Sequence, residues 1–92
     1  MTVEIIEKEL KVPRDLLLRE GMKRYLESEF RRLEIDAAKI RRRYEVKSFD
    51  DLWAKLERGE VSESECFDDL TRLEYLETRV EKVLRLLKEL SI

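Results

Sequence analysis

The residue types that most often carry enzyme chemistry are nearly absent from this chain. It contains no His, the usual general acid or base near neutral pH. Its single thiol, Cys66, has no imidazole to generate a thiolate, and one Cys builds neither a disulfide nor a zinc site. Glu74, Glu77 and Glu81 are grouped on one predicted helix, but we expect them to face solvent beside its apolar seam. We therefore expect a protein that is not an enzyme and that holds no metal or cofactor.

Charged side chains are the most abundant functional groups in this sequence. Lys and Arg number 20 and Asp and Glu number 22, so 46% of the residues are charged, against about 25% in an ordinary soluble domain. The charges are unevenly spread, because residues 1–48 hold 13 basic and 10 acidic side chains and residues 49–92 hold 7 and 12. This segregation predicts either recognition of a charged partner or pairing of the two halves with each other.

Two groups of residues are candidate binding sites. One is a set of arginines that could contact nucleic-acid phosphates. Its members are Arg31, Arg32, Arg41, Arg42 and Arg43. The other combines apolar anchors with acidic residues that would orient a basic protein partner. Its members are Trp53, Leu56, Phe67, Leu70, Asp50, Asp51, Asp68 and Asp69. A simpler interpretation is that these charges complement the dipoles of helices, with arginines at a C-terminus and aspartates at N-termini.

The elements that must position these residues are helices. Between residues 13 and 44 the apolar residues recur in steps of three and four, which predicts one long helix. They are Leu18, Met22, Leu26, Phe30, Leu33, Ala37, Ile40 and Tyr44. Gly21 lies beside an extra step of four, where it marks a close helix contact or a bend.

Two more helices are predicted after a break at residues 45–47. Ser48 is a candidate N-cap with Asp51 three residues later, and Gly59 suits the left-handed residue that ends a helix, which predicts a short helix over 49–58. Ser62 or Ser64 caps a last helix over 64–90. Its apolar stripe is wider than two positions in seven, which predicts burial by more than one neighbour.

Residues 1–12 are predicted to form an extended arm. Val3 and Ile5 share one parity, and Ile6 and Leu10 share the other, which indicates a short strand with one register slip. Such an arm would pair with another chain or lie along the helices.

The predicted fold is therefore all-α. Residues 13–92 form an antiparallel hairpin of two long helices joined by a short helix, and the arm precedes them. A hairpin covers only one side of each helix, so the wide stripe leaves apolar surface in water. We expect two copies to form a four-helix bundle dimer, although a complex with a different protein would cover the same surface.

Composition also indicates the habitat. The chain is rich in Glu, Lys and Arg and has no Asn or Gln, a pattern typical of heat-adapted proteins. It has no apolar run long enough to span a membrane and no signal-peptide layout at its N-terminus. We expect a cytoplasmic protein from a thermophile.

Three stretches carry a resemblance to a known class of proteins. The sequence ELKVPRDLL at residues 9–17 resembles small prokaryotic antitoxins of type II toxin–antitoxin pairs. The stretches RYEVKSFDDL at 43–52 and FDDLTRLE at 67–74 are similar to short helical antitoxin-like proteins of archaea and bacteria. The resemblance implies a protein that binds and masks a toxic partner, often a ribonuclease.

Together these observations favour a non-enzymatic protein–protein interaction module, and the resemblance makes an antitoxin one form of it. Two alternatives remain open. The chain could be a helical dimer that binds nucleic acid through its Arg-rich segment, or a purely structural helical dimer.

Overall fold

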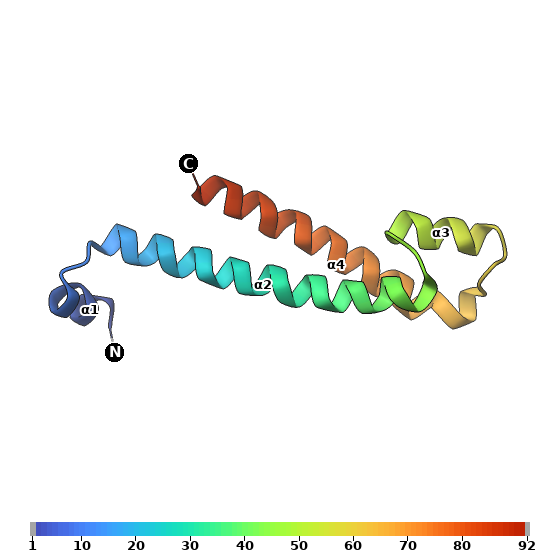
Figure 1. The fold of residues 1–92 in the computed structure, drawn as a ribbon, viewed down its shortest axis with the longest axis horizontal. Helices are drawn as coiled ribbons and strands as arrows, with labels where there is room; N and C mark the ends of the chain where they lie inside the picture. Colours follow the sequence, from blue (N-terminus) through green and yellow to red (C-terminus); the bar gives the residue numbers. More distant parts are fainter. Residues whose placement is uncertain (1, 92) are drawn as a thin grey trace.

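The computed structural model describes residues 2–91, which form four helices (Figure 1). They are α1 (Val3–Leu10), α2 (Arg14–Tyr44), α3 (Phe49–Glu57) and α4 (Glu63–Leu90). No strand occurs among the described residues, so the all-α prediction is confirmed. The helices expected over 13–44, 49–58 and 64–90 are observed with ends that differ by at most one residue.

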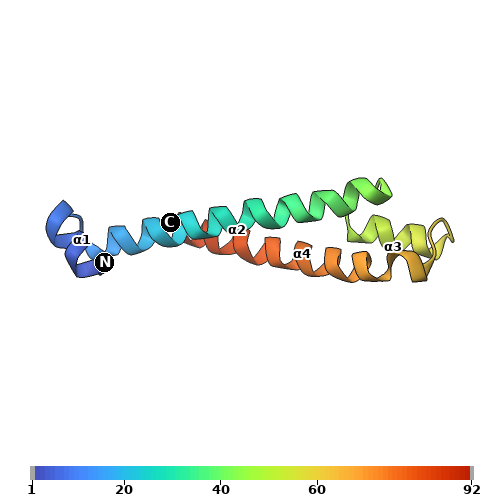
Figure 2. The ribbon, with the colours of Figure 1, turned by 90° about the horizontal axis from the view of Figure 1, so that it is seen from below.

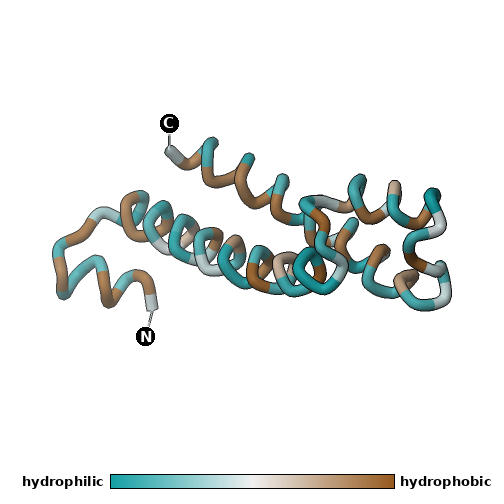
Figure 3. Tube along the Cα trace, turned by 45° about the vertical axis from the view of Figure 1, so that its right-hand side comes forward, coloured by the Kyte–Doolittle hydropathy of each residue, from teal (hydrophilic) through white to brown (hydrophobic). Residues whose placement is uncertain are grey.

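The two long helices run antiparallel in an elongated molecule (Figure 2). The principal extents are 62 × 26 × 16 Å, and the radius of gyration is 19.0 Å, where a compact chain of this length has about 12 Å. Apolar residues, brown in Figure 3, recur along both helices. Toward the N-terminus of α2 and the C-terminus of α4 the two helices diverge (Figure 1).

The predicted extended arm over residues 1–12 is wrong, because Val3–Leu10 is the helix α1. Thr2 caps it by accepting a hydrogen bond from the backbone N–H of Ile5, and Lys11 ends it in the left-handed conformation. Val3, Ile6 and Leu10 follow a helical spacing, whereas Val3 with Ile5 and Ile6 with Leu10 follow an alternating one, and the pattern of so short a segment does not separate the two. Met1 lies outside the described residues.

The ends of α3 and α4 follow the predicted capping. Ser48 Oγ accepts from the N–H of Asp51, and Asp51 in turn accepts from the N–H of Lys47. Gly59 has φ +75°, the left-handed value expected after α3. Ser62, one of the two candidates, caps α4 by accepting from the N–H of Glu65. These caps fix α3 in a short connection between the long helices.

The hydrophobic core lies at one end of the hairpin. Leu33, Ala37 and Ile40 of α2 pack on α4, and Leu52 of α3 is also fully covered. Both α2 and α3 pack on α4, which confirms that its wide stripe has more than one neighbour. In contrast, α2 has no buried residue before Leu33. Before Leu33, Leu26 and Phe30 are partly buried against the core, and the part of α2 that precedes them is largely uncovered on its apolar side.

Candidate functional site

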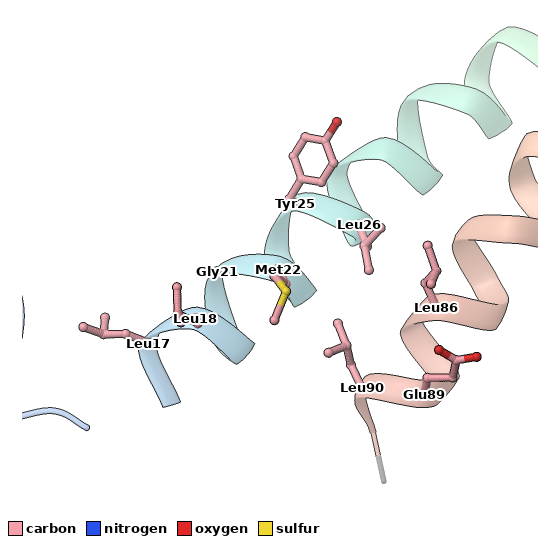
Figure 4. Close-up of a pocket in the computed structure, with 9 residues that line it drawn as sticks. All are labelled: Leu17, Leu18, Gly21, Met22, Tyr25, Leu26, Leu86, Glu89 and Leu90. Atoms are coloured by element: carbon pink, nitrogen blue, oxygen red, sulfur yellow. The ribbon is translucent and has the colours of Figure 1, made fainter. Parts of the chain in front are cut away.

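An apolar groove lies between the diverging ends of α2 and α4 (Figure 4). Its volume is about 600 Å³. Nine residues line it: Leu17, Leu18, Gly21, Met22, Tyr25 and Leu26 from α2, and Leu86, Glu89 and Leu90 from α4. Glu89 is the only charged residue among these nine. The groove has the size and apolar character of a binding site.

The groove exists because α2 continues beyond its partner helix. Leu26 and Leu87 still pack against the edge of the core, but toward the N-terminus of α2 the helices separate. Met22 is therefore 49% exposed and Tyr25 62% exposed. Clusters of exposed large apolar side chains are uncommon on monomeric soluble proteins, so this one is a candidate interaction surface.

Gly21 lies in this groove and makes no close contact within the chain. A Cβ placed on Gly21 would meet no atom within 4 Å. A glycine inside a helix costs about 1 kcal/mol relative to alanine, and the fold of one chain does not use the space it leaves. Of the two expectations for Gly21, a close helix contact is absent among residues 2–91.

The two ends of the molecule carry opposite charge. We call residues 2–32 and 79–91 the splayed end, which contains the groove, and residues 33–78 the loop end. The splayed end holds 12 basic and 9 acidic side chains, a net charge of +3. The loop end holds 8 basic and 13 acidic side chains, a net charge of −5. The groove is therefore the apolar part of a basic surface.

The predicted acidic partner site at the loop end divides into structural and exposed residues. Leu70 is buried in the core, and Leu56 packs against the core. Asp51 belongs to the cap of α3, and Asp69 pairs with α2. These four residues take part in the packing and hydrogen bonding of the fold, and of the four Asp51 stays exposed.

The other four predicted residues remain on the surface. Trp53 is 46% exposed and stacks on Phe49 with ring centroids 6.3 Å apart. Phe67 is 54% exposed, and Asp50 and Asp68 are exposed beside these aromatic residues in the sequence. The loop end thus presents aromatic surface among acidic side chains.

Asp69 joins the ends of α2 and α4. Its Oδ2 accepts hydrogen bonds from Tyr44 Oη at 2.6 Å and from Arg43 Nη1 at 2.7 Å. The hydrogen bond from Tyr44 and the nearby Arg43 guanidinium lower the pKa of Asp69. Burial, and secondly Asp69, raise the pKa of Tyr44 to about 12. This arrangement ties the end of α2 to the start of α4.

The arginine group does not form one free basic patch. Arg32 pairs with Glu29 at 2.7 Å, and Arg43 pairs with Asp69. Arg41 pairs with Glu77 at 3.3 Å and with Glu34 at 3.6 Å, although its Nε is buried without a partner. Arg31 and Arg42 are exposed. Three of the five arginines are therefore already neutralised by carboxylates of the same chain.

Glu77 has a role that the sequence did not reveal. It was expected to face solvent, but its Oε2 accepts from the N–H of Phe49 at 2.9 Å and from Arg41. Glu77 therefore links α4 to the start of α3 and to α2. Its position next to Leu76 in the heptad pattern gives no signal of this contact, because the contact depends on where α3 folds back.

Cys66 is a buried free thiol, and burial raises its pKa. Among residues 2–91 no group of three or more acidic, Cys or His residues is placed to hold a metal ion. None of the described helices combines the length and the apolar character that a membrane span requires.

Comparison with known proteins relates the whole chain to one family. Residues 1–92 match the family model described as "Uncharacterized protein MJ0235 family". The uncharacterized protein MJ0235 of Methanocaldococcus jannaschii is 37% identical over 76 residues, which cover 83% of this chain and 93% of that protein. No solved structure shows significant similarity.

Proposed function

This chain belongs to the MJ0235 family, and from that premise we propose that it is a non-enzymatic protein–protein interaction module that binds through the groove at its splayed end. The observation that carries the proposal is the groove itself, an opening of about 600 Å³ lined by apolar residues of α2 and α4. The geometry suits a helix or an aromatic side chain of another protein.

The uncovered groove provides the free energy for association. Full burial of one Leu or Met side chain is worth about 1.5–3 kcal/mol relative to exposure. Leu18, Met22, Tyr25 and Leu86 each keep a large exposed fraction, so covering the four would contribute several kcal/mol. The association must also overcome the entropy lost when two chains combine. A partner that covers the groove together with neighbouring surface would meet that cost.

Two kinds of partner fit this proposal. A second copy would bring two more long helices and complete a four-helix bundle dimer. The antitoxin role implied by the sequence resemblance is the special case in which the partner is a toxin. Co-expression with the product of the neighbouring gene tests that case, because an antitoxin would co-purify with the toxin and rescue growth.

The nucleic-acid alternative has less support. It requires a continuous set of free cations, whereas Arg32, Arg41 and Arg43 are ion-paired. The Arg-rich segment is better explained as part of the hairpin's own ion pairs.

The decisive variant is Met22→Glu, with Leu84→Glu as its control. Leu84 is on α4, is 47% exposed, and does not line the groove, so both changes put a carboxylate on exposed apolar surface. We expect light scattering at micromolar concentration to show an assembly for the wild type and for Leu84→Glu, and a single chain for Met22→Glu. Equal effects of the two changes, or an undisturbed assembly in both, would reject the groove as the binding surface.

A further inference from the structure

We propose that the partner in the groove is the loop end of a second copy of this chain. The two copies pack antiparallel along their long axes, so that each splayed end lies on the loop end of the other. This inference rests on the proposed function, and it specifies the partner and its orientation. Three observations support it: the surface area, the distribution of charge and the exposed aromatic residues.

The single chain exposes more surface than a compact monomer of its mass. Its accessible surface is 7244 Å², whereas a folded monomer of 11.2 kDa has about 5,700 Å². The excess is about 1,500 Å² per chain, so a dimer that buried it would cover about 3,000 Å² in total. Stable homodimer interfaces cover about 2,000–5,000 Å². The excess surface therefore matches what one stable interface between two copies buries.

The charge distribution sets the orientation of the two copies. With the splayed end at +3 and the loop end at −5, a pair that joined like ends would bring like charges together. An antiparallel pair brings each basic end onto an acidic end, and the twofold symmetry makes this favourable contact twice.

The charges on both surfaces are free to form such contacts. At the splayed end, Arg24 and Lys88 have no ion pair with a described residue of their own chain. At the loop end the same holds for Asp50 and Asp68, whereas Asp69 is already engaged by Arg43. The carboxylates that the fold leaves unpaired lie beside Trp53 and Phe67 in the sequence.

The loop end also supplies apolar groups for the groove. Trp53 and Phe67 are both about half exposed, and aromatic residues often dominate the binding energy of interfaces. The groove is apolar and lies within a basic surface, and the loop end presents aromatic side chains within an acidic one. The two ends of one chain are thus complementary in both polarity and charge.

Photo-crosslinking tests the orientation directly. A photoreactive phenylalanine analogue replaces Met22, an exposed side chain whose replacement leaves the core intact, and an equal mixture of ¹⁴N- and ¹⁵N-labelled chains identifies links between copies. We expect crosslinked peptides from residues 49–69 of the other copy. The same analogue at Leu84 serves as the control and should give few such links.

Each alternative outcome has a definite meaning. Links from position 22 to residues 14–32 of the other copy would overturn the antiparallel arrangement and leave the groove as an interaction surface. An absence of links, with a single chain in solution, would overturn the second copy as the partner. The proposed function fails separately, when Met22→Glu and Leu84→Glu have the same effect on every assembly that forms.

Charge reversal provides an independent measurement. The double change Asp50→Lys and Asp68→Lys alters exposed residues of the loop end only. We expect it to raise the dimer dissociation constant by about tenfold or more at low salt, with a smaller effect at 1 M salt because the charges are screened. An unchanged dissociation constant at low salt would contradict the contact between unlike ends.

Discussion

Asp69 shows how one carboxylate links charge, hydrogen bonding and pH in this fold. It accepts from Tyr44 and Arg43, and its side chain is 22% exposed while that of Arg43 is 60% exposed. An ion pair as open as Arg43–Asp69 contributes little by itself. The shorter, better-covered hydrogen bond from Tyr44 is therefore the main stabilising contact of Asp69.

The lowered pKa of Asp69 predicts a loss of stability in acid. Because folding lowers this pKa below its ordinary 3.8, the stabilisation is complete above that value and is lost as the pH falls toward the folded pKa. We expect Asp69→Asn to lower the free energy of unfolding by about 1–2 kcal/mol at pH 7. Urea unfolding from pH 2 to 7 should show the gap between variant and wild type closing in acid. A gap that stays constant over this range would contradict the role assigned to the Asp69 carboxylate.

Part of this residue-level picture could be predicted from the sequence. Capping by Ser48 and Ser62 follows from local spacing. The contacts of Glu77 with α2 and α3 could not be predicted, because they join residues 28 and 36 positions apart in sequence. Only the folded arrangement of three helices brings those atoms together.

At the scale of elements, the helices with capping signals and long heptad repeats were predictable. The long helix α2 has eight apolar positions with helical spacing, whereas α1 has eight residues in all. In so short a segment, β-branched residues such as Val3 and Ile5 favour a strand by propensity. The segment is nevertheless helical. Thr2 caps it, and Glu4 and Glu7 form ion pairs with Arg14.

Replacement of each of the two glycines by alanine should change the free energy of unfolding in opposite directions. Gly59 has φ +75°, which an L side chain adopts only with strain, so Gly59→Ala should lower the free energy of unfolding by about 1–2 kcal/mol. Gly21 is inside α2 with open space around it, so Gly21→Ala should raise the free energy of unfolding by about 0.5–1 kcal/mol. Urea denaturation of both variants at a concentration where the chain is monomeric checks the signs. A loss of stability in Gly21→Ala under these conditions would contradict the open space around Gly21.

At the scale of the whole molecule, the sequence predicted apolar surface that a hairpin leaves uncovered, but it did not indicate the groove at the splayed end. Apolar stripes wider than a hairpin can cover are visible in the heptad pattern. Half of the residues predicted to bind a partner, among them Leu70 and Asp69, instead make contacts within the fold. The groove depends on how far α2 and α4 diverge, and no local spacing encodes that divergence. The apolar run Leu16–Leu18, followed by Met22, was the feature of the sequence that could have indicated apolar surface at this end.

Thermal unfolding tests the assembly and the predicted habitat together. The relative from Methanocaldococcus jannaschii and the abundance of charged residues lead us to expect a midpoint well above the roughly 45–65 °C of mesophile domains. If association stabilises the fold, the midpoint should rise with protein concentration, and Met22→Glu should remove that dependence. Calorimetry over a hundredfold concentration range provides the measurement. A midpoint independent of concentration in the wild type would mean that each chain unfolds alone.

The burial of Cys66 has a practical consequence for further work. Its thiol is covered by the core and its pKa is raised, so thiol-directed reagents should react with it slowly in the native protein. A cysteine introduced on the surface would therefore take up a spin label or a dye selectively, with the native thiol left in place. Pulsed magnetic resonance on such singly labelled chains would report distances across any symmetric pair without redesign of the interior.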